Sequence, residues 1–193
     1  MKKKILIMIA VLVMLGSGGI YMYNKLTKPN FSPKTTKLYQ RGFRLLEEQY
    51  GTYFKEHYKG IEKIEFSPIY ITGDNGGSML NANVRPTIYD KYGNKATIEN
   101  YTPNSYGLAT HIFLDFDGSG NDVIELMDSQ GNEIDVSNAK HLPDEAKLTK
   151  ARSTDENISL LVQDGQLKDV VKDEKGTPEA ENIYNAKLSK GEE

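Results

Sequence analysis

Acidic side chains gather in one short stretch of the sequence, DFDGSGNDVIE. Asp115, Asp117 and Ser119 stand at alternate positions ahead of a glycine. A calcium-binding loop opens in this way, with oxygen ligands at positions one, three and five and a glycine at position six. The rest of the stretch departs from that pattern, because position eight is Asp122 instead of an apolar residue. Glu125 also comes one place before the position of the closing acid. A calcium site would therefore use Asp115, Asp117, Ser119 and Glu125.

A plain hairpin turn explains the same residues without a metal. Gly, Ser, Asn and Asp tolerate left-handed backbone and hydrogen-bond their own turn, so such turns need no ion. We favour this interpretation and predict neither a resident metal nor a cofactor. Four carboxylates, those of Asp115, Asp117, Asp122 and Glu125, are then available to bind a cationic protein partner.

Catalytic patterns are missing from the sequence. The three histidines, His57, His111 and His141, are isolated, and the chain has no cysteine. Asp115 and Asp117 are close enough to perturb each other's pKa, but general acid–base chemistry would need a second group and a cleft. No nucleophile elbow, phosphate loop or dinucleotide fingerprint occurs. We expect a binding protein and not an enzyme, with an unrecognised cell-wall enzyme as an alternative.

Alternation of apolar residues organises the middle of the chain. Ile112, Leu114 and Phe116 alternate with other residues, and the pattern resumes after a glycine-rich turn. Alternation bounded by Gly, Asn, Asp and Ser is typical of half-buried antiparallel strands. We therefore predict a central β-meander over residues 110–136. Further strands are predicted at Ile61–Thr72, Met79–Tyr89, Ala96–Tyr101, Leu167–Val171 and Asn182–Leu188.

Helical spacing appears in two segments. Apolar and tyrosine residues recur at three- and four-residue steps over Thr35–Lys59, and a shorter pattern covers Asp155–Gln163. The expected fold class is α+β. In it an amphipathic helix packs on a twisted antiparallel sheet of about six to eight strands, with a short second helix.

The N-terminus has the character of a membrane anchor. Three lysines precede a largely apolar run from Ile5 to Tyr23 that contains no charge, as in a bilayer-crossing helix. A cleaved signal peptide is the alternative. We predict an anchor at residues 1–24, a stalk at 25–34 and a single extracellular domain at 35–190. The N-terminus would lie in the cytoplasm and the domain outside the cell membrane.

Charge divides the chain into two unlike halves. Residues 25–110 carry a net charge of +4, whereas residues 111–193 carry −10. A solvated surface explains much of this imbalance. The acidic half would also suit a cationic partner, and it argues against nucleic acid because nothing there would neutralise phosphates.

Several stretches resemble a known group of proteins. These are the lysine-started anchor, YFKEHYKGIEKIEFSPIYI, VRPTIYDKYGNKA and LDFDGSGNDVIEL. Together they are similar to small exported, membrane-anchored proteins of Gram-positive bacteria, and among named groups to the TipC-type immunity proteins. The resemblance implies an outward-facing protein that neutralises a secreted, type VII, LXG-like toxin by occlusion. The alternative is a calcium- or ligand-binding cell-surface protein.

Overall fold

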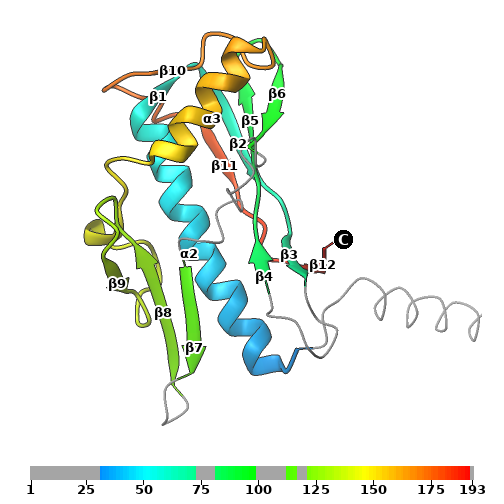
Figure 1. The fold of residues 1–193 in the computed structure, drawn as a ribbon, viewed down its shortest axis with the longest axis vertical. Coiled ribbons are helices and arrows are strands. Elements are labelled where there is room, and N and C mark those ends of the chain that lie inside the picture. The colour runs from blue at the N-terminus through cyan, green and yellow to red at the C-terminus, as the bar shows by residue number, and fades with distance from the viewer. Residues whose placement is uncertain (1–30, 73–80, 99–111, 117–120, 192–193) are drawn as a thin grey trace, which may run out of the picture.

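The computed structural model describes residues 31–72, 81–98, 112–116 and 121–191 (Figure 1). Within these ranges the fold is α+β, with two α-helices and four small sheets. None of the described helices is both long and apolar enough to cross a bilayer. The predicted anchor from Ile5 to Tyr23 and most of the predicted stalk lie outside the described residues.

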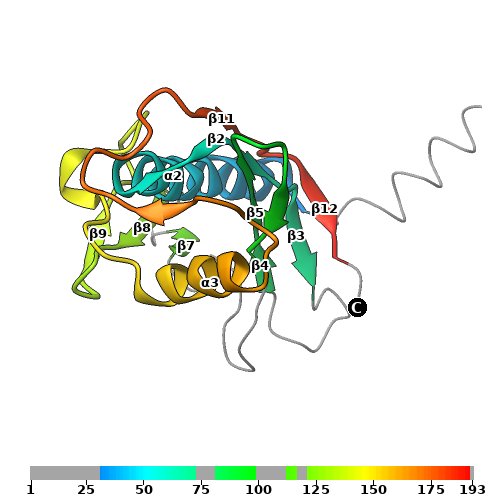
Figure 2. The same ribbon diagram turned by 90° about the horizontal axis from the view of Figure 1, so that it is seen from above.

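Helix α2 (Pro33–His57) is the axis of the fold. Ser32 caps its N-terminus, because its side-chain oxygen accepts a hydrogen bond from the backbone N–H of Thr35, and Pro33 follows in the first turn. Figures 1 and 2 show α2 passing between the strands β7–β9 on one side and β2, β3, β11 and β12 on the other. The predicted long helix is confirmed, and its tyrosine stripe is core, since Tyr50 and Tyr53 are buried.

Two strands are interrupted by proline. The predicted strand at residues 61–72 divides into β2 (Ile61–Phe66) and β3 (Ile69–Thr72) at Pro68. Its antiparallel partner divides into β4 (Asn81–Asn83) and β5 (Pro86–Asp90). Ser67 holds the two partners together across the break. Its backbone N–H donates to the Arg85 carbonyl at 2.9 Å, and its Oγ accepts from the Arg85 N–H at 2.9 Å.

The prediction of a single antiparallel sheet was wrong. The strand orders are β11-β2-β5-β6 and β12-β3-β4, together with β7-β8-β9 and β1-β10. Strand β11 (Glu181–Ile183) pairs with β2, and β12 (Leu188–Lys190) pairs with β3, both in parallel. The antiparallel strands already occupy one edge of β2 and of β3, so the returning C-terminal segment adds to the free edges.

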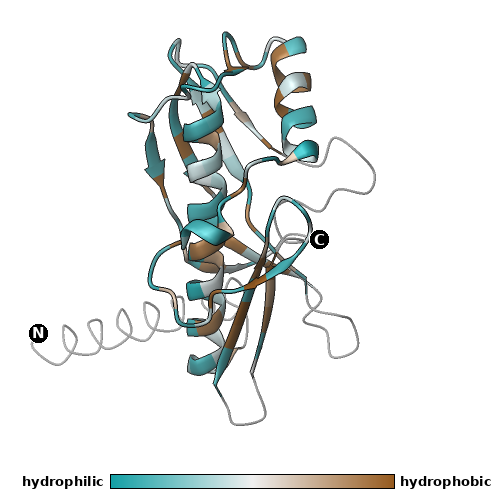
Figure 3. Ribbon diagram, turned by 90° about the vertical axis from the view of Figure 1, so that its left-hand side faces the viewer, coloured by the Kyte–Doolittle hydropathy of each residue, from teal (hydrophilic) through white to brown (hydrophobic). Residues whose placement is uncertain are grey.

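The predicted central meander is confirmed. Strands β7 (Ile112–Phe116), β8 (Asp122–Met127) and β9 (Glu133–Asp135) are antiparallel neighbours. Figure 3 looks onto this sheet and shows β7 and β8 lying in front of α2. Gly42 lets β7 approach the helix closely, since a Cβ at that position would collide with Leu114 Cδ2.

The remaining elements are short strands and a second helix. Strand β6 (Lys95–Thr97) forms a hairpin with β5, and β1 (Tyr58–Lys59) pairs with β10 (Val171–Lys172). A 3-10 turn at Asp144–Ala146 precedes helix α3 (Arg152–Gln163), which is the predicted second helix with an earlier start.

Candidate functional site

The predicted acidic cluster is divided between the two faces of the β7-β8-β9 sheet. Asp115 is exposed on β7, and Glu125 lies on the outward face of β8, opposite Phe113. Asp122 lies opposite Phe116, at a position that faces α2, and its Oδ2 is 3.4 Å from Arg41 Nη1. The parity of side chains along a strand explains the division, because neighbouring residues point to opposite faces.

The outward face carries acids that the sequence analysis did not select. Asp135 lies opposite Glu125, and Glu133 lies opposite Met127, so both acids belong to the outward face. None of the three strands contains a lysine or an arginine. Phe113 is 48 % exposed among these acids. We call this surface the acidic face; its members are Phe113, Asp115, Glu125, Glu133 and Asp135.

One signal in the sequence could have revealed the full acidic face. Once Ile124 and Leu126 are assigned to the core, the alternation makes Glu125 point outward. The tight turn after Asp128 then carries the same alternation into β9, where Ile134 faces inward and its two acidic neighbours outward. Proximity in the sequence alone does not show this relation, because Glu133 and Asp135 lie beyond the next turn.

Only two of the four residues of the alternative calcium site, Asp115 and Glu125, lie among the described residues. Asp117 and Ser119 lie outside the described residues. Asp115 pairs with Val123 and Glu125 with Phe113, so the two remaining acids are diagonal neighbours on the acidic face. Across the residues that the structure describes, no group of three or more His, Asp or Glu is arranged to hold a metal ion.

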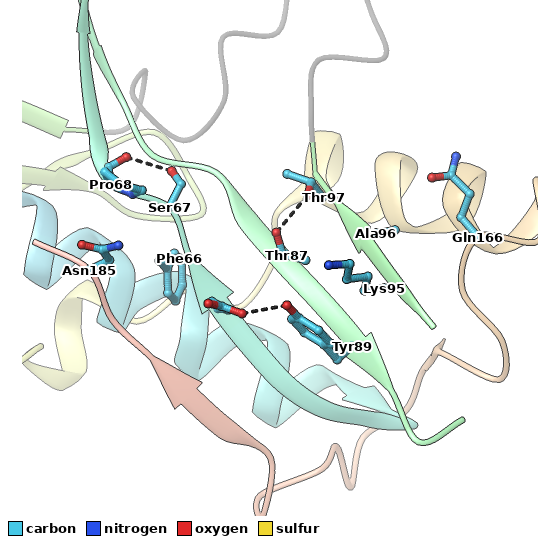
Figure 4. A pocket seen from close by; sticks show the side chains of 11 residues that line it. Phe66, Ser67, Pro68, Thr87, Tyr89, Lys95, Ala96, Thr97, Gln166 and Asn185 are labelled. Carbon is cyan, nitrogen blue, oxygen red and sulfur yellow. Dashed lines mark hydrogen bonds between the residues drawn. The ribbon is translucent and has the colours of Figure 1, made fainter. Parts of the chain in front are cut away.

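A second surface feature is a polar hollow of about 550 Å³ on the sheet β11-β2-β5-β6 (Figure 4). Its side chains bond to one another. The Tyr89 hydroxyl donates to Glu65 Oε2 at 2.7 Å, and the hydroxyls of Thr87 and Thr97 are 2.9 Å apart. The bond from Tyr89 holds the pKa of Glu65 below its usual value, and the pKa of Tyr89 is raised by the same bond. Neither group is therefore poised to exchange protons near neutral pH.

A third cluster joins α2 to α3. Asp155 accepts hydrogen bonds from the hydroxyls of Tyr53 at 2.7 Å and Tyr58 at 2.5 Å, and from Lys172 Nζ at 2.5 Å. Burial, together with the bond to Asp155, raises the pKa of both tyrosines. Burial opposes protonation of Lys172, but its bonds to Asp155 and Tyr53 outweigh it and raise the pKa. The phenols and the ammonium stay protonated, so the cluster offers no activated nucleophile.

No family model, curated protein or solved structure matches this chain. The resemblance to TipC-type immunity proteins therefore stays a prediction, and the geometry of the described residues carries the functional argument.

The histidines do not add a site. His57 packs against Tyr53 with 4.7 Å between ring centres, and the mostly exposed His141 places Nδ1 3.4 Å from Glu48 Oε1. His111 lies outside the described residues. The acidic face combines charges of one sign with an exposed aromatic residue, and this combination suits the binding of a protein partner.

Proposed function

We propose that this chain is a membrane-tethered binding protein whose acidic face docks on a cationic surface of a secreted protein toxin and neutralises it by occlusion. One observation carries the proposal. The outward face of β7-β8-β9 presents Asp115, Glu125, Glu133 and Asp135 around the half-exposed Phe113, with no lysine or arginine in the three strands.

Two physical effects would favour binding at the acidic face, namely charge attraction at short range and burial of an exposed aromatic ring. Acids of one sign on one face attract a cationic surface over a Debye length of about 8–10 Å, which speeds encounter and favours the right partner. An exposed aromatic ring supplies apolar area that is buried only in the complex. A basic toxin cleft covered in this way would lose access to its substrate.

The proposed location follows from the N-terminal sequence. The apolar run from Ile5 to Tyr23 would cross the cell membrane once, with the N-terminus in the cytoplasm and the domain outside. A secreted toxin would meet the acidic face there. In this proposal the chain acts by binding, without catalysis and without nucleic acid.

A matched pair of triple variants tests the proposal. The first removes three charges from the acidic face by Glu125→Gln, Glu133→Gln and Asp135→Asn. The control removes three charges from exposed acids elsewhere, by Glu62→Gln, Glu174→Gln and Glu179→Gln. Both change the net charge equally, so a difference between them reports the place of the charge and not its amount.

The measurement uses the full-length chain and the secreted proteins encoded by neighbouring genes, each purified. We expect one of them to bind with an affinity that falls at higher salt, and to inhibit growth of cells that lack this chain. The acidic-face variant should bind at least tenfold more weakly and should fail to protect, whereas the control should behave as the parent. Equal effects of the two variants, or no binding by any of these proteins, would overturn the proposal.

A further inference from the structure

Glu47 is a buried acid on the side of α2 that the C-terminal segment covers. Its side chain is 0 % exposed. One oxygen, Oε2, accepts a hydrogen bond from the backbone N–H of Asn185 at 3.1 Å. The other, Oε1, has no hydrogen-bond partner in the part of the chain that the structure describes. A buried carboxyl with a single donor is unusual, because buried polar atoms are nearly always bonded.

The charged groups around Glu47 are engaged elsewhere. Arg44, one turn earlier, donates from Nε to Glu48 Oε1 at 3.1 Å, and its guanidinium carbon lies 3.4 Å from the centre of the Tyr184 ring. Glu48 also faces His141. From the C-terminal segment the Tyr184 phenol faces this cluster, and burial raises the pKa of that phenol. No ion pair to Glu47 forms among the described residues.

The environment therefore favours the neutral acid. Taking a carboxylate out of water without a partner cation costs far more than one backbone hydrogen bond returns. Burial raises the pKa of Glu47 to about 8, while the N–H of Asn185 and the charge of Arg44 offset part of the rise and the charge of Glu48 adds to it. Glu47 thus changes charge close to neutral pH.

Of the elements packed around Glu47, the segment that contains β11 and β12 is the one that can move away. Strands β11 and β12 contain three residues each, and among the described strands each pairs with a single neighbour. Asn185 lies in the break between them. Short edge strands open at lower free energy than a long helix with a buried core face. Helix α2, in contrast, is fixed by large buried side chains such as Leu46, Tyr50 and Phe54.

We propose that Glu47 is a proton-operated latch: its neutral carboxyl keeps β11 and β12 docked on α2, and its ionisation favours their release. Movement of this segment would bring an ionised Glu47 into contact with water, because the segment supplies the Asn185 N–H that bonds to the buried carboxyl. Asn185 also lines the polar hollow of Figure 4, so the latch controls one wall of that hollow.

The direction of the pH dependence follows from linkage. In the open state Glu47 meets water and titrates near its ordinary pKa of 4.5, whereas in the docked state it titrates near 8. The docked state is therefore fully favoured below about pH 4.5. It weakens progressively as the pH rises towards 8, and no further change comes from Glu47 above that.

Hydrogen exchange of the full-length chain from pH 5 to pH 9, corrected for intrinsic exchange rates, tests the latch. In the parent we expect protection of residues 181–190 to fall by up to about tenfold per pH unit until pH 8 and then to level off. The Glu47→Gln variant keeps an acceptor for the Asn185 N–H but cannot ionise, so its protection should not change over this range. Glu56→Gln, which changes an exposed acid further along α2, is the control, and it should keep the pH dependence of the parent.

Three outcomes would overturn the latch. The pH dependence could persist in Glu47→Gln, or the loss of protection could spread evenly over α2 instead of concentrating at residues 181–190. Carboxyl carbon NMR of the unmodified chain supplies the third, independent of whether the variant folds: the Glu47 signal could titrate in the ordinary carboxyl range. None of these measurements involves the acidic face or a toxin, so the latch and the proposed function can fail separately.

Discussion

Asp90 and Asp128 occupy equivalent positions in two hairpin turns of the same design. Oδ1 of Asp90 accepts from the backbone N–H groups of Tyr92 and Asn94, and its Oδ2 accepts from Asn94 Nδ2. Asp128 makes the same three bonds with Gln130 and Asn132. The glycine before each asparagine has positive φ, at 84° and 87°. One turn chemistry therefore sets the register of both hairpins.

The two aspartates should nevertheless differ in importance for stability. Asp90 is 0 % exposed and also accepts from the backbone N–H of Lys168 at 2.8 Å, so it joins its hairpin to the segment after α3. We expect Asp90→Ala to lower the free energy of unfolding by about 3 kcal/mol, because buried donors lose a charged acceptor. Asp128→Ala should cost clearly less, since water can replace its bonds. Urea unfolding of both variants measures this, and equal losses would contradict it.

The two turns could be predicted from the sequence, whereas the long-range strand pairing could not. The patterns DKYGN and DSQGN contain all the groups that make the turns, so both hairpins were predictable from local residues. The pairing of Glu181–Ile183 with Lys63–Glu65 was not, because a three-residue strand carries too little pattern to fix its partner or direction. The ion pair of Arg41 with Asp122 likewise depends on the fold bringing distant residues together.

Glu47 should make the whole fold less stable as the pH rises. Its pKa is raised from 4.5 to about 8 in the folded chain, so folding is favoured below pH 4.5 and loses stability up to about pH 8. At pH 7 the loss is on the order of 3 kcal/mol. We expect Glu47→Gln to be more stable than the parent at pH 7 and nearly equal to it at pH 4.5. Thermal unfolding at both values checks this, and a constant difference between the chains would be inconsistent with it.

Asp155 should be the main link between α3 and α2. Asp155→Ala removes the acceptor of Tyr53, Tyr58 and Lys172 at once, and we expect it to cost about 2 kcal/mol. Asp155→Asn keeps one acceptor oxygen and should cost less. Hydrogen exchange localises the effect: protection should fall first in residues 152–163, and an unchanged α3 would argue against the assignment.

The effects of substitutions at Gly42 on α2 and at Leu114 on β7 should depend on each other, because the two residues are in contact. Alanine is favoured over glycine in a helix by about 1 kcal/mol, but the new methyl would overlap Leu114 Cδ2, and overpacking costs about 1–3 kcal/mol. We expect Gly42→Ala to be destabilising in the parent. In a Leu114→Ala background the same change should be neutral or stabilising, because the shortened side chain leaves room. A double-mutant cycle from urea unfolding measures the coupling, and additive effects would show that β7 does not pack on Gly42.

Asp122 and Glu125 should separate stability from partner binding. Asp122 faces α2 and pairs with Arg41 at 3.4 Å, with both side chains partly exposed, so Asp122→Asn should cost about 0.5 kcal/mol of stability. Because the Asp122 carboxylate pairs with Arg41 on the inward face of the sheet, the same change should leave toxin binding within twofold of the parent.

Glu125→Gln removes a charge from the acidic face. It should weaken toxin binding several-fold and reduce the salt dependence of binding, with little effect on unfolding. Since the two acids are three residues apart on one strand, a general effect of local charge would weaken binding equally in both variants. Unequal effects on binding would instead support the outward face of β7-β8-β9 as the surface that meets the partner.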